Sequence, residues 1–371
     1  MRQALERYCG DVVNLGPTPP WFARPLRVAS RVSQRLPHRY RFIDTNSDTL
    51  SRAYSRSLST ALVAADHDWL FAPYASAEIA HMETDGPIVY YSDATFRIMC
   101  DYYTGFTGLS RRARQAGDDL ERRAIDRAAV ACFASEWAAT SAVRDYGAPP
   151  EKVCVVPLSA NLSDPPAYES LRFERHAEGV RLLFVGVDWE RKGGPVAHRV
   201  LLSLHRAGVP ATLTVVGCAP PARFRTANVS VVGFLSKNNP QQRRRLESLF
   251  RDADFLIMPA RAECYGCVFV EAAAFALPSL APNTGGVSSA MAGGSSGLLF
   301  DQEATADDYA AAIIDVLADP NRYHALRVSA RRAFDTQLGW EAWGRRLNQV
   351  TAEFRARPPR SFTPVSARAT T

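Results

Sequence analysis

The sequence predicts an α/β fold with two doubly wound domains, each built on a parallel sheet. The first observation behind this prediction is a regular alternation of short apolar runs and helical stretches between residues 180 and 320. Repeated strand–helix units with short links are typical of such sheets. The second observation is a similar, less regular series before residue 160. The third is the length of 371 residues, because roughly 100–200 residues per domain indicates two domains.

The second half of the chain has the clearer elements. Short apolar runs predict strands at residues 180–186, 211–217, 229–233, 255–258 and 278–281, and the runs at 180–186 and 255–258 are typical of buried parallel strands. Helices are expected between and after these strands, at residues 195–206, 240–250, 268–275 and 309–317. Asn239 followed by Pro240 is a typical helix start, and residues 305–308 are expected to cap the last helix.

The first half is similar in kind, with strands expected at residues 11–15, 69–72, 88–91, 131–134 and 153–156. Each run ends in a polar or turn residue, where a ligand can bind at the carboxyl edge of the sheet. The polar, proline-bearing stretch 159–179 is the predicted linker. We therefore expect domains at 1–161 and 178–337, a helix at 338–356 that crosses back to the first domain, and a disordered tail at 357–371.

The start of the chain departs from the usual order of elements. Two-domain proteins of this type open with an apolar strand, a glycine-rich turn and a helix, whereas the sequence from Met1 begins at what reads as the end of that helix. The first strand and its turn are missing from this sequence. We expect either that the natural protein begins upstream or that this version is truncated and impaired.

The composition is that of a globular protein with a substantial core, at 47% hydrophobic and 22% charged residues. The sequence contains no run of about 18 apolar residues, so it predicts no membrane span. Seven cysteines, an odd number spread from Cys9 to Cys267, do not form a disulfide framework. This pattern predicts a reducing, cytoplasmic location.

The net charge does not choose between the possible classes of partner. The net charge is +6, and only three of the 44 basic residues are lysines: Lys152, Lys192 and Lys237. An excess this small on a long chain does not predict a nucleic-acid partner. It fits a phosphate-bearing ligand, an anionic membrane surface or an ordinary solvated surface. The arginine-rich stretch 111–123 is open to the last two readings, so peripheral contact with the inner face of a membrane stays an open alternative.

Residues 259–273 carry the strongest chemical signal. Glu263 lies in a loop after a predicted buried strand, and Glu271 lies eight positions later inside the following helix. Gly266 lets the backbone approach a ligand near the helix start, where unpaired N–H groups and the helix dipole favour an anion. Carboxylates accept paired hydrogen bonds from the diols of a ribose or a sugar. The almost wholly apolar surroundings of Glu271 make an unpaired carboxylate costly there, which favours a functional role.

This block resembles the glutamate–seven residues–glutamate motif of glycosyltransferase family 4, retaining enzymes of the GT-B fold, in which two Rossmann-like domains face each other across a cleft. Further segments that resemble the family are residues 185–194, 284–287 with 297–300, and 134–137 with 146–147 and 155–157. The resemblance therefore covers most of the chain. It implies transfer of a hexose from a nucleoside-diphosphate sugar to a glycan, a lipid or another acceptor, with retention of configuration, in polysaccharide or glycoconjugate biosynthesis.

The resemblance also implies roles for individual residues. Glu263 would bind the transferred sugar and Lys192 would neutralise the departing diphosphate, so these two residues form the expected catalytic pair. Glu271 would bind the ribose. The remaining expected donor-binding residues are Gly266, Cys267, Arg191, Gly186, Gly233 and Leu235, and Asp93 is the expected contact on the acceptor side. A leaving group held by lysine and backbone amides needs no metal, so we expect no metal and no cofactor beyond the nucleotide-sugar substrate.

Two departures from the family pattern keep alternatives open. Val187 stands where the family has an arginine, and Ser92 with Asp93 stands where it has a histidine, often followed by aspartate. One alternative is a sugar-nucleotide-binding protein without catalysis, and the other is a sugar-nucleotide epimerase of related fold. Cys264 and Cys267 have the spacing of a metal or redox pair, but without a second pair we read them as small buried thiols in the wall of the site. The choice between uridine and guanosine, the sugar and the acceptor stay open.

Overall fold

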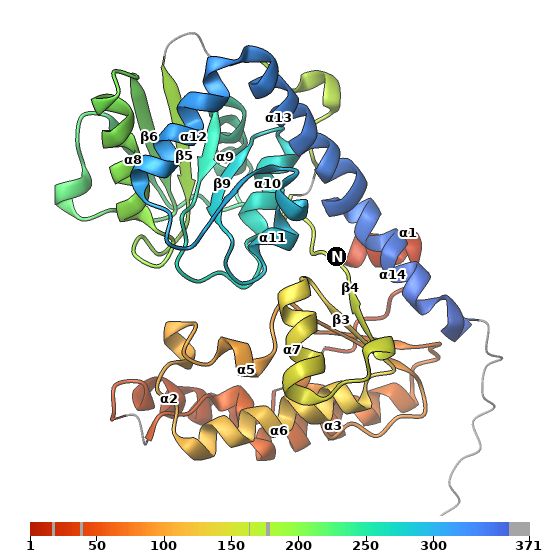
Figure 1. The fold of residues 1–371 in the computed structure, drawn as a ribbon. Helices are drawn as coiled ribbons and strands as arrows, with labels where there is room; N and C mark the ends of the chain where they lie inside the picture. Colours follow the sequence, from red (N-terminus) through yellow and green to blue (C-terminus); the bar gives the residue numbers. More distant parts are fainter. Residues whose placement is uncertain (17–18, 38–39, 163, 176–178, 356–371) are drawn as a thin grey trace, which may run out of the picture.

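The computed structural model describes residues 1–16, 19–37, 40–162, 164–175 and 179–355. Within them the chain forms two α/β units, one above the other in Figure 1, and the last helix runs from the second unit back to the first. Each unit is built on a sheet in which every pair of strands is parallel. The expected fold class is confirmed by this arrangement and by the solved structures compared below.

The first unit contains a four-stranded sheet in the order β1-β2-β3-β4. Its strands are β1 (Leu70–Pro73), β2 (Ile88–Ser92), β3 (Val130–Phe133) and β4 (Val153–Val155). Its helices are α1 (Arg2–Tyr8), α2 (Ala23–Ser33), α3 (Asp48–Val63), α4 (Ser76–Ile79), α5 (Phe96–Met99), α6 (Arg111–Arg127) and α7 (Glu136–Tyr146). The loop between α5 and α6 includes a short 3₁₀ turn, η3 (Thr104–Phe106).

One strand expected in this unit is absent from the described residues. Residues 10–16, which include the strand expected at 11–15, have no regular secondary structure. Val13, in the middle of the apolar run, is 69% exposed. A short apolar run becomes a strand only where a neighbouring strand pairs with it and a core buries its side chains. Val12 and Leu15 are only partly buried against the core, and none of the described strands pairs with this run. That prediction was wrong, whereas the prediction about sequence upstream of Met1 stays a prediction.

The second unit contains a six-stranded sheet in the order β10-β9-β8-β5-β6-β7. Its strands are β5 (Val180–Val185), β6 (Ala211–Val216), β7 (Val229–Gly233), β8 (Phe255–Ile257), β9 (Ser279–Pro282) and β10 (Gly297–Phe300). Its helices are α8 (Gly194–Arg206), α9 (Pro240–Asp252), α10 (Cys267–Ala274), α11 (Val287–Ala290), α12 (Ala306–Ala318) and α13 (Pro320–Ala333). All five strands expected here are present, and β10 is added at the edge.

The helix starts in this unit follow their local sequence. The Asn239 side chain accepts hydrogen bonds from the backbone N–H of Gln241 and Gln242, and therefore caps α9 as expected. Thr305 and Asp308 form a reciprocal capping box. Because Thr305 is the cap itself, α12 begins at Ala306 and not at residue 309.

The last helix, α14 (Trp340–Arg355), joins the two units. It leaves the second unit and lies beside α1, as Figure 1 shows. The Trp343 side chain is almost fully buried and makes edge-to-face contacts with Phe71 and Tyr91 of the first sheet, at ring-centroid distances of 5.8 and 6.1 Å. The helix therefore packs on the first domain. The exact domain boundaries stay predictions, and the tail at 357–371 lies outside the described residues.

Candidate active site

The loop between β8 and α10 carries the first expected site residues. Gly266 caps α10 with a positive φ of 89°, and a Cβ added there would lie 2.6 Å from the Phe269 ring. Only glycine accepts both conditions without strain. No side chain caps α10. The Phe269 N–H donates 3.0 Å to the carbonyl oxygen of Gly266, so the N–H groups of Cys267 and Val268 are the ones in the first turn that can face an anionic ligand.

Glu263 lies in this loop at the centre of a cluster of charges. Its buried carboxylate forms an ion pair with the Lys192 ammonium, and Arg191 Nη1 lies 3.8 Å from Glu263 Oε2. The same Arg191 guanidinium donates a hydrogen bond of 2.9 Å to the carbonyl oxygen of Ala262. The loop after β5 and the loop after β8 therefore bring the two expected catalytic residues together.

Two glycines allow these loops to approach each other. Gly193 has a φ of 81°, and a Cβ there would lie 1.8 Å from the carbonyl oxygen of Pro259. A Cβ on Gly186 would lie 3.0 Å from Cγ of Lys192, so the absence of a side chain at Gly186 leaves room for the lysine stem. The glycines seen in the sequence at 186 and 193 thus position Lys192 against Glu263.

Glu271 has a different partner, which the sequence reasoning missed. Its carboxylate is buried in α10 and forms an ion pair with Lys237, and the backbone N–H of Asn161 lies nearby and favours its charged form. Burial raises the pKa of Glu271 above its usual value, and the Lys237 ammonium offsets part of that rise. A signal was present in the sequence, because Lys237 is one of only three lysines among 44 basic residues.

Lys237 belongs to the loop between β7 and α9, which also carries the expected residues Gly233 and Leu235. Gly233 ends β7 with a positive φ of 79°, and Leu235 packs against the main hydrophobic core. The Cys267 thiol lies within electrostatic reach of both Glu263 and Glu271. Burial, the largest cause, raises the pKa of Cys264 and of Cys267 to about 12, so both thiols are neutral.

The first domain contributes Asp93 and two residues that the sequence reasoning missed. Burial raises the pKa of Asp93, and the charge of Glu263 adds to that effect, which places Asp93 beside the donor-side cluster. Tyr102 and Tyr103 reach across to the loop of Glu263 with their hydroxyl groups. Val187, at the position of the family's arginine, is 68% exposed and contributes no charge.

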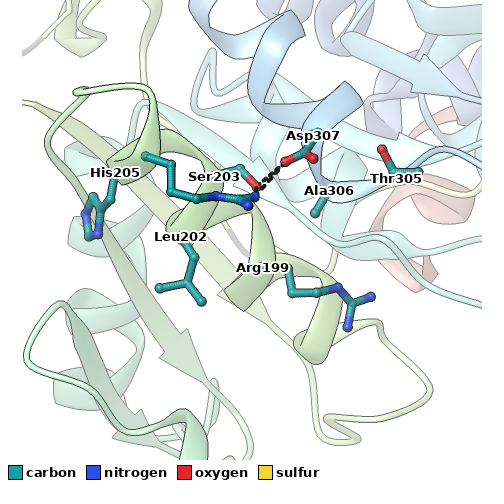
Figure 2. Close-up of a pocket in the computed structure, with 8 residues that line it drawn as sticks. Arg199, Leu202, Ser203, His205, Thr305, Ala306 and Asp307 are labelled. Atoms are coloured by element: carbon teal, nitrogen blue, oxygen red, sulfur yellow. Dashed lines mark hydrogen bonds and ion pairs between the residues drawn. The ribbon is translucent and has the colours of Figure 1, made fainter.

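One surface hollow lies away from the expected site residues. It has a volume of about 760 Å³ and lies between the C-terminal half of α8 and the N-terminal end of α12. Figure 2 shows Ser203 facing Asp307 there. None of the expected site residues lines it. A cavity of about 90 Å³ is lined by Lys237 and Asn161, the two partners of Glu271. Among the described residues, no group of three or more His, Cys, Asp or Glu side chains could hold a metal ion.

Comparison with known proteins finds a family model that is similar to the second domain. Residues 179–319 match the model described as glycosyl transferases group 1. D-inositol 3-phosphate glycosyltransferase of Thermobispora bispora is 30% identical over 238 residues, which are 60% of this chain and 55% of that protein. The enzyme of the same name from Geodermatophilus obscurus is 30% identical over 264 residues, which are 66% of this chain and 56% of that protein. The chain thus spans little more than half the length of these relatives.

Solved structures extend the comparison to the whole fold. Sucrose-phosphate synthase from Thermosynechococcus elongatus superposes with a TM-score of 0.57 at 18% identity, over 85% of this chain and 81% of that chain. WaaG, a glycosyltransferase involved in lipopolysaccharide biosynthesis, gives a TM-score of 0.57 at 19% identity, over 82% of this chain and 83% of that chain. The two domains have the GT-B fold, and the second domain is similar to the glycosyl transferases group 1 family over residues 179–319.

Proposed function

We propose that this protein is a retaining glycosyltransferase that takes a sugar from a nucleoside-diphosphate sugar. The observation that supports this most strongly is the pair of buried carboxylates, Glu263 and Glu271, at the two ends of a stretch that includes the open N-terminus of α10. Each carboxylate is paired with a lysine. Two diol-binding groups with an anion-binding site between them match the two ends and the middle of a nucleotide sugar.

In this proposal each group acts on one part of the donor. Glu271 binds the ribose and Glu263 the transferred sugar. The diphosphate lies at the first turn of α10, where Cys267 and its neighbours present N–H groups. Lys192 has three N–H donors, so it can keep its bond to Glu263 while another donor faces the leaving diphosphate. Asp93 approaches from the acceptor side. The charge that develops on the leaving group is thus stabilised by groups already in place.

We also propose that the reaction needs no divalent metal, because Lys192 and the helix N–H groups supply the positive charge. The acceptor in this proposal is a glycan or a lipid-linked molecule, and the site of action is cytoplasmic. No observation specifically favours a non-catalytic nucleotide-binding role or an epimerase.

Donor binding and turnover test this assignment. Calorimetry with UDP, GDP and a panel of UDP- and GDP-sugars should find a donor for the parent protein, and release of nucleoside diphosphate should follow its turnover in EDTA. Glu271→Gln should weaken binding of the nucleoside diphosphate by about 1.5–3 kcal/mol, because a charged acceptor for the ribose is lost. Glu263→Gln should lower turnover while the affinity for the nucleoside diphosphate, which lacks the sugar, stays close to that of the parent.

Glu303→Ala, a change at an exposed glutamate of the same domain, serves as the control. Parent-like donor binding by both site variants would show that the two glutamates are wrongly assigned. Loss of turnover in EDTA that Mg²⁺ or Mn²⁺ restores would contradict the metal-free mechanism alone.

The surface of α2 supports peripheral contact with an anionic membrane as part of the same proposal. Trp21 just before the helix and Val28 and Val32 within it are 87%, 60% and 54% exposed. On a helix, positions 21, 28 and 32 fall on one stripe, and the exposed Arg24 and Arg31 fall on the adjacent one. An exposed apolar stripe beside arginines is typical of helices that lie in a membrane interface. In the part of the chain that the structure describes, no helix is long and apolar enough to cross a membrane.

The stretch 111–123, which was open to a membrane role, is partly engaged within the protein. Arg114 forms an ion pair of 2.6 Å with Asp101, and Arg122 donates a hydrogen bond of 2.8 Å to the carbonyl oxygen of Tyr146. The face of α2 is therefore the better candidate for this contact.

A further inference from the structure

Two consecutive tyrosines of the first domain reach into the sugar end of the proposed donor site. They lie between α5 and η3, on the loop that follows β2 and the Asp93 turn. The Tyr102 hydroxyl accepts a hydrogen bond of 2.9 Å from the backbone N–H of Glu263, and the Tyr103 hydroxyl accepts one of 3.0 Å from that of Cys264. The proposed function assigns neither residue a role.

Tyr103 makes the more specific contacts. Its hydroxyl also donates to Oε1 of Glu263 at 3.3 Å, while Lys192 occupies Oε2 of the same carboxylate. The guanidinium of Arg191 lies over the Tyr103 ring, 4.8 Å from its centroid. Burial raises the pKa of Tyr103 and the charge of Glu263 raises it further. The hydroxyl therefore keeps its proton and can donate a hydrogen bond to the carboxylate.

Tyr102 contacts the same loop in a different way. Its hydroxyl shares a hydrogen bond of 2.9 Å with the Thr284 hydroxyl and lies 3.3 Å from the carbonyl oxygen of Glu263. Its ring packs against Trp137 of the first domain at a centroid distance of 5.2 Å. These are contacts to backbone and to a neutral side chain, and no contact with a carboxylate oxygen is among them. Tyr102 therefore holds the backbone of the Glu263 loop, whereas Tyr103 contacts the Glu263 carboxylate, the group that would bind the sugar.

We propose that Tyr103 is a positioning residue that orients the Glu263 carboxylate only when the two domains are together. The inference rests on the proposed function, because it assigns Glu263 to the transferred sugar. With Lys192 on one oxygen and Tyr103 on the other, the carboxylate is fixed in one orientation, and its remaining lone pairs face the sugar hydroxyls. Lys192 belongs to the same domain as Glu263, but Tyr103 comes from the other domain. Separation of the domains therefore removes one of the two constraints.

This arrangement couples closure of the domains to recognition of the sugar and leaves the nucleotide end out. Glu271, Lys237 and the start of α10 all belong to the second domain, and neither tyrosine contacts them in the described structure. Nucleoside diphosphate can bind to the separated second domain. A correctly held sugar requires the first domain with Tyr103 in place.

Removal of one hydroxyl tests the role of Tyr103. Tyr103→Phe keeps the ring under Arg191 and deletes the donor to Glu263, and Tyr102→Phe is the matched control because it deletes the neighbouring hydroxyl. Each protein is titrated with UDP and GDP by calorimetry. Transfer of the sugar from UDP-glucose, GDP-mannose and related donors to water is followed by release of nucleoside diphosphate. For Tyr103→Phe we expect kcat to fall about ten- to hundredfold, as for loss of a hydrogen bond to a charged group. The nucleoside diphosphate Kd should stay within about twofold of the parent.

The control separates positioning from a structural effect. Tyr102→Phe should lower thermal stability and raise the KM for the donor, with a smaller fall in kcat than Tyr103→Phe. Equal kcat in Tyr103→Phe and the parent would overturn the inference, and so would an equal loss of nucleoside diphosphate affinity and kcat, which indicates general distortion. A parent that binds no nucleotide sugar at all would contradict the proposed function itself, so the two failures are distinguishable.

Discussion

Lysine is rare in this protein and is concentrated at the candidate site. Of the three lysines, Lys192 pairs with Glu263 and Lys237 pairs with Glu271. Arginine would fill both oxygens of a carboxylate with its planar fork, whereas a lysine ammonium is a compact charge that leaves the other oxygen accessible. A carboxylate that must accept hydrogen bonds from a ligand is therefore better paired with lysine. This gives a physical reason for lysine at these two positions of an otherwise arginine-rich chain.

Lys237 should control the protonation of Glu271. Replacement of Lys237 by Met removes the charge that offsets burial, so the pKa of Glu271, already raised, should rise further. Only the ionised carboxylate accepts hydrogen bonds on both oxygens from the ribose. Affinity for nucleoside diphosphate should therefore fall as pH decreases through the raised pKa, and in Lys237→Met this fall should begin at a higher pH. Calorimetry between pH 5.5 and 8 measures how far the pH at which affinity begins to fall differs between the variant and the parent. Each pKa unit of difference corresponds to a roughly tenfold change in the proton affinity of Glu271.

Lys152→Met is the control for that experiment. Lys152 lies in the first domain, where its ammonium donates a hydrogen bond to the carbonyl oxygen of Asp126 on α6, away from Glu271. Its pH profile should coincide with that of the parent. If Lys237→Met also follows the parent profile, Lys237 does not govern the charge of Glu271.

Another buried carboxylate, Glu121, affects stability and not the donor site. It lies on α6 beneath the first sheet and accepts a hydrogen bond of 2.8 Å from the Tyr90 hydroxyl. Burial raises the pKa of Glu121 to about 7, and hydrogen bonds from Tyr90 and Ser76 offset part of that rise. Because the folded-state pKa is above the ordinary value, its contribution to stability is present at acidic pH and is lost as pH rises through about 7.

Glu121→Gln should remove this pH dependence. At 1.36 kcal/mol per pKa unit, the contribution of Glu121 to the free energy of unfolding should differ by roughly 3 kcal/mol between pH 4.5 and pH 8. The glutamine keeps a hydrogen-bonding group for Tyr90 but carries no charge. Urea unfolding at pH 4.5 and pH 8 measures the difference, with the exposed Glu151→Gln as control. A variant whose stability changes with pH as much as that of the parent would show that Glu121 does not titrate in this range.

At the scale of secondary structure elements, α10 and α2 illustrate opposite uses of apolar residues. In α10, Phe269, Val270 and the alanines 272–274 are all buried, so the helix lies inside the second domain with its open N-terminus at the site. In α2, only Ala23, Ser30 and Ser33 are buried, while apolar residues on another face stay exposed. The α10 pattern makes a rigid support for ligand binding, and the α2 pattern leaves a surface for a partner.

The face of α2 should bind anionic vesicles. The double variant Arg24→Gln/Arg31→Gln should weaken binding to phosphatidylglycerol vesicles about 30-fold, since each arginine near an anionic surface contributes about 1 kcal/mol. Val28→Ser with Val32→Ser should weaken it further by removing apolar area. Co-sedimentation with vesicles of increasing phosphatidylglycerol content measures both effects. Leu202→Ser, at an exposed apolar position of α8, should leave binding unchanged. Equal binding of the parent to neutral and anionic vesicles would rule out the electrostatic part of the contact.

At the scale of the whole molecule, the contacts between the domains include two that differ in kind. The first is the packing of α14, where Trp343 is buried against the first sheet and the Trp340 indole N–H donates 2.9 Å to the carbonyl oxygen of Ala160. The second is the set of hydroxyl contacts from Tyr102 and Tyr103 at the site itself. Packing at the back is apolar and extensive, whereas the contacts over Glu263 are a few hydrogen bonds. Motion between the domains should therefore occur about the α14 side and open the Glu263 side.

The sequence by itself determined the features that depend on neighbouring residues. Parallel strands have short apolar runs, so the five strands expected between residues 180 and 281 could be recognised one by one, including β7 at the partly exposed edge of the sheet. The Asn239 and Thr305 helix caps could be recognised for the same reason, since a cap acts within three residues. The spacing of Glu263 and Glu271 and the glycine before α10 likewise lie within one local segment, which is why the family resemblance could be found there.

Only the tertiary structure decided which distant groups meet. Tyr103 lies 160 residues from Glu263, and Lys237 lies 34 residues from Glu271, so no local pattern marks either pair. The strand expected at residues 11–15 was wrong for a related reason. An apolar run becomes a strand only if neighbouring strands pair with it and a core buries it, and Val13 is exposed to solvent. Local sequence determines what an element can be, but burial and long-range pairing decide whether it forms and what it touches.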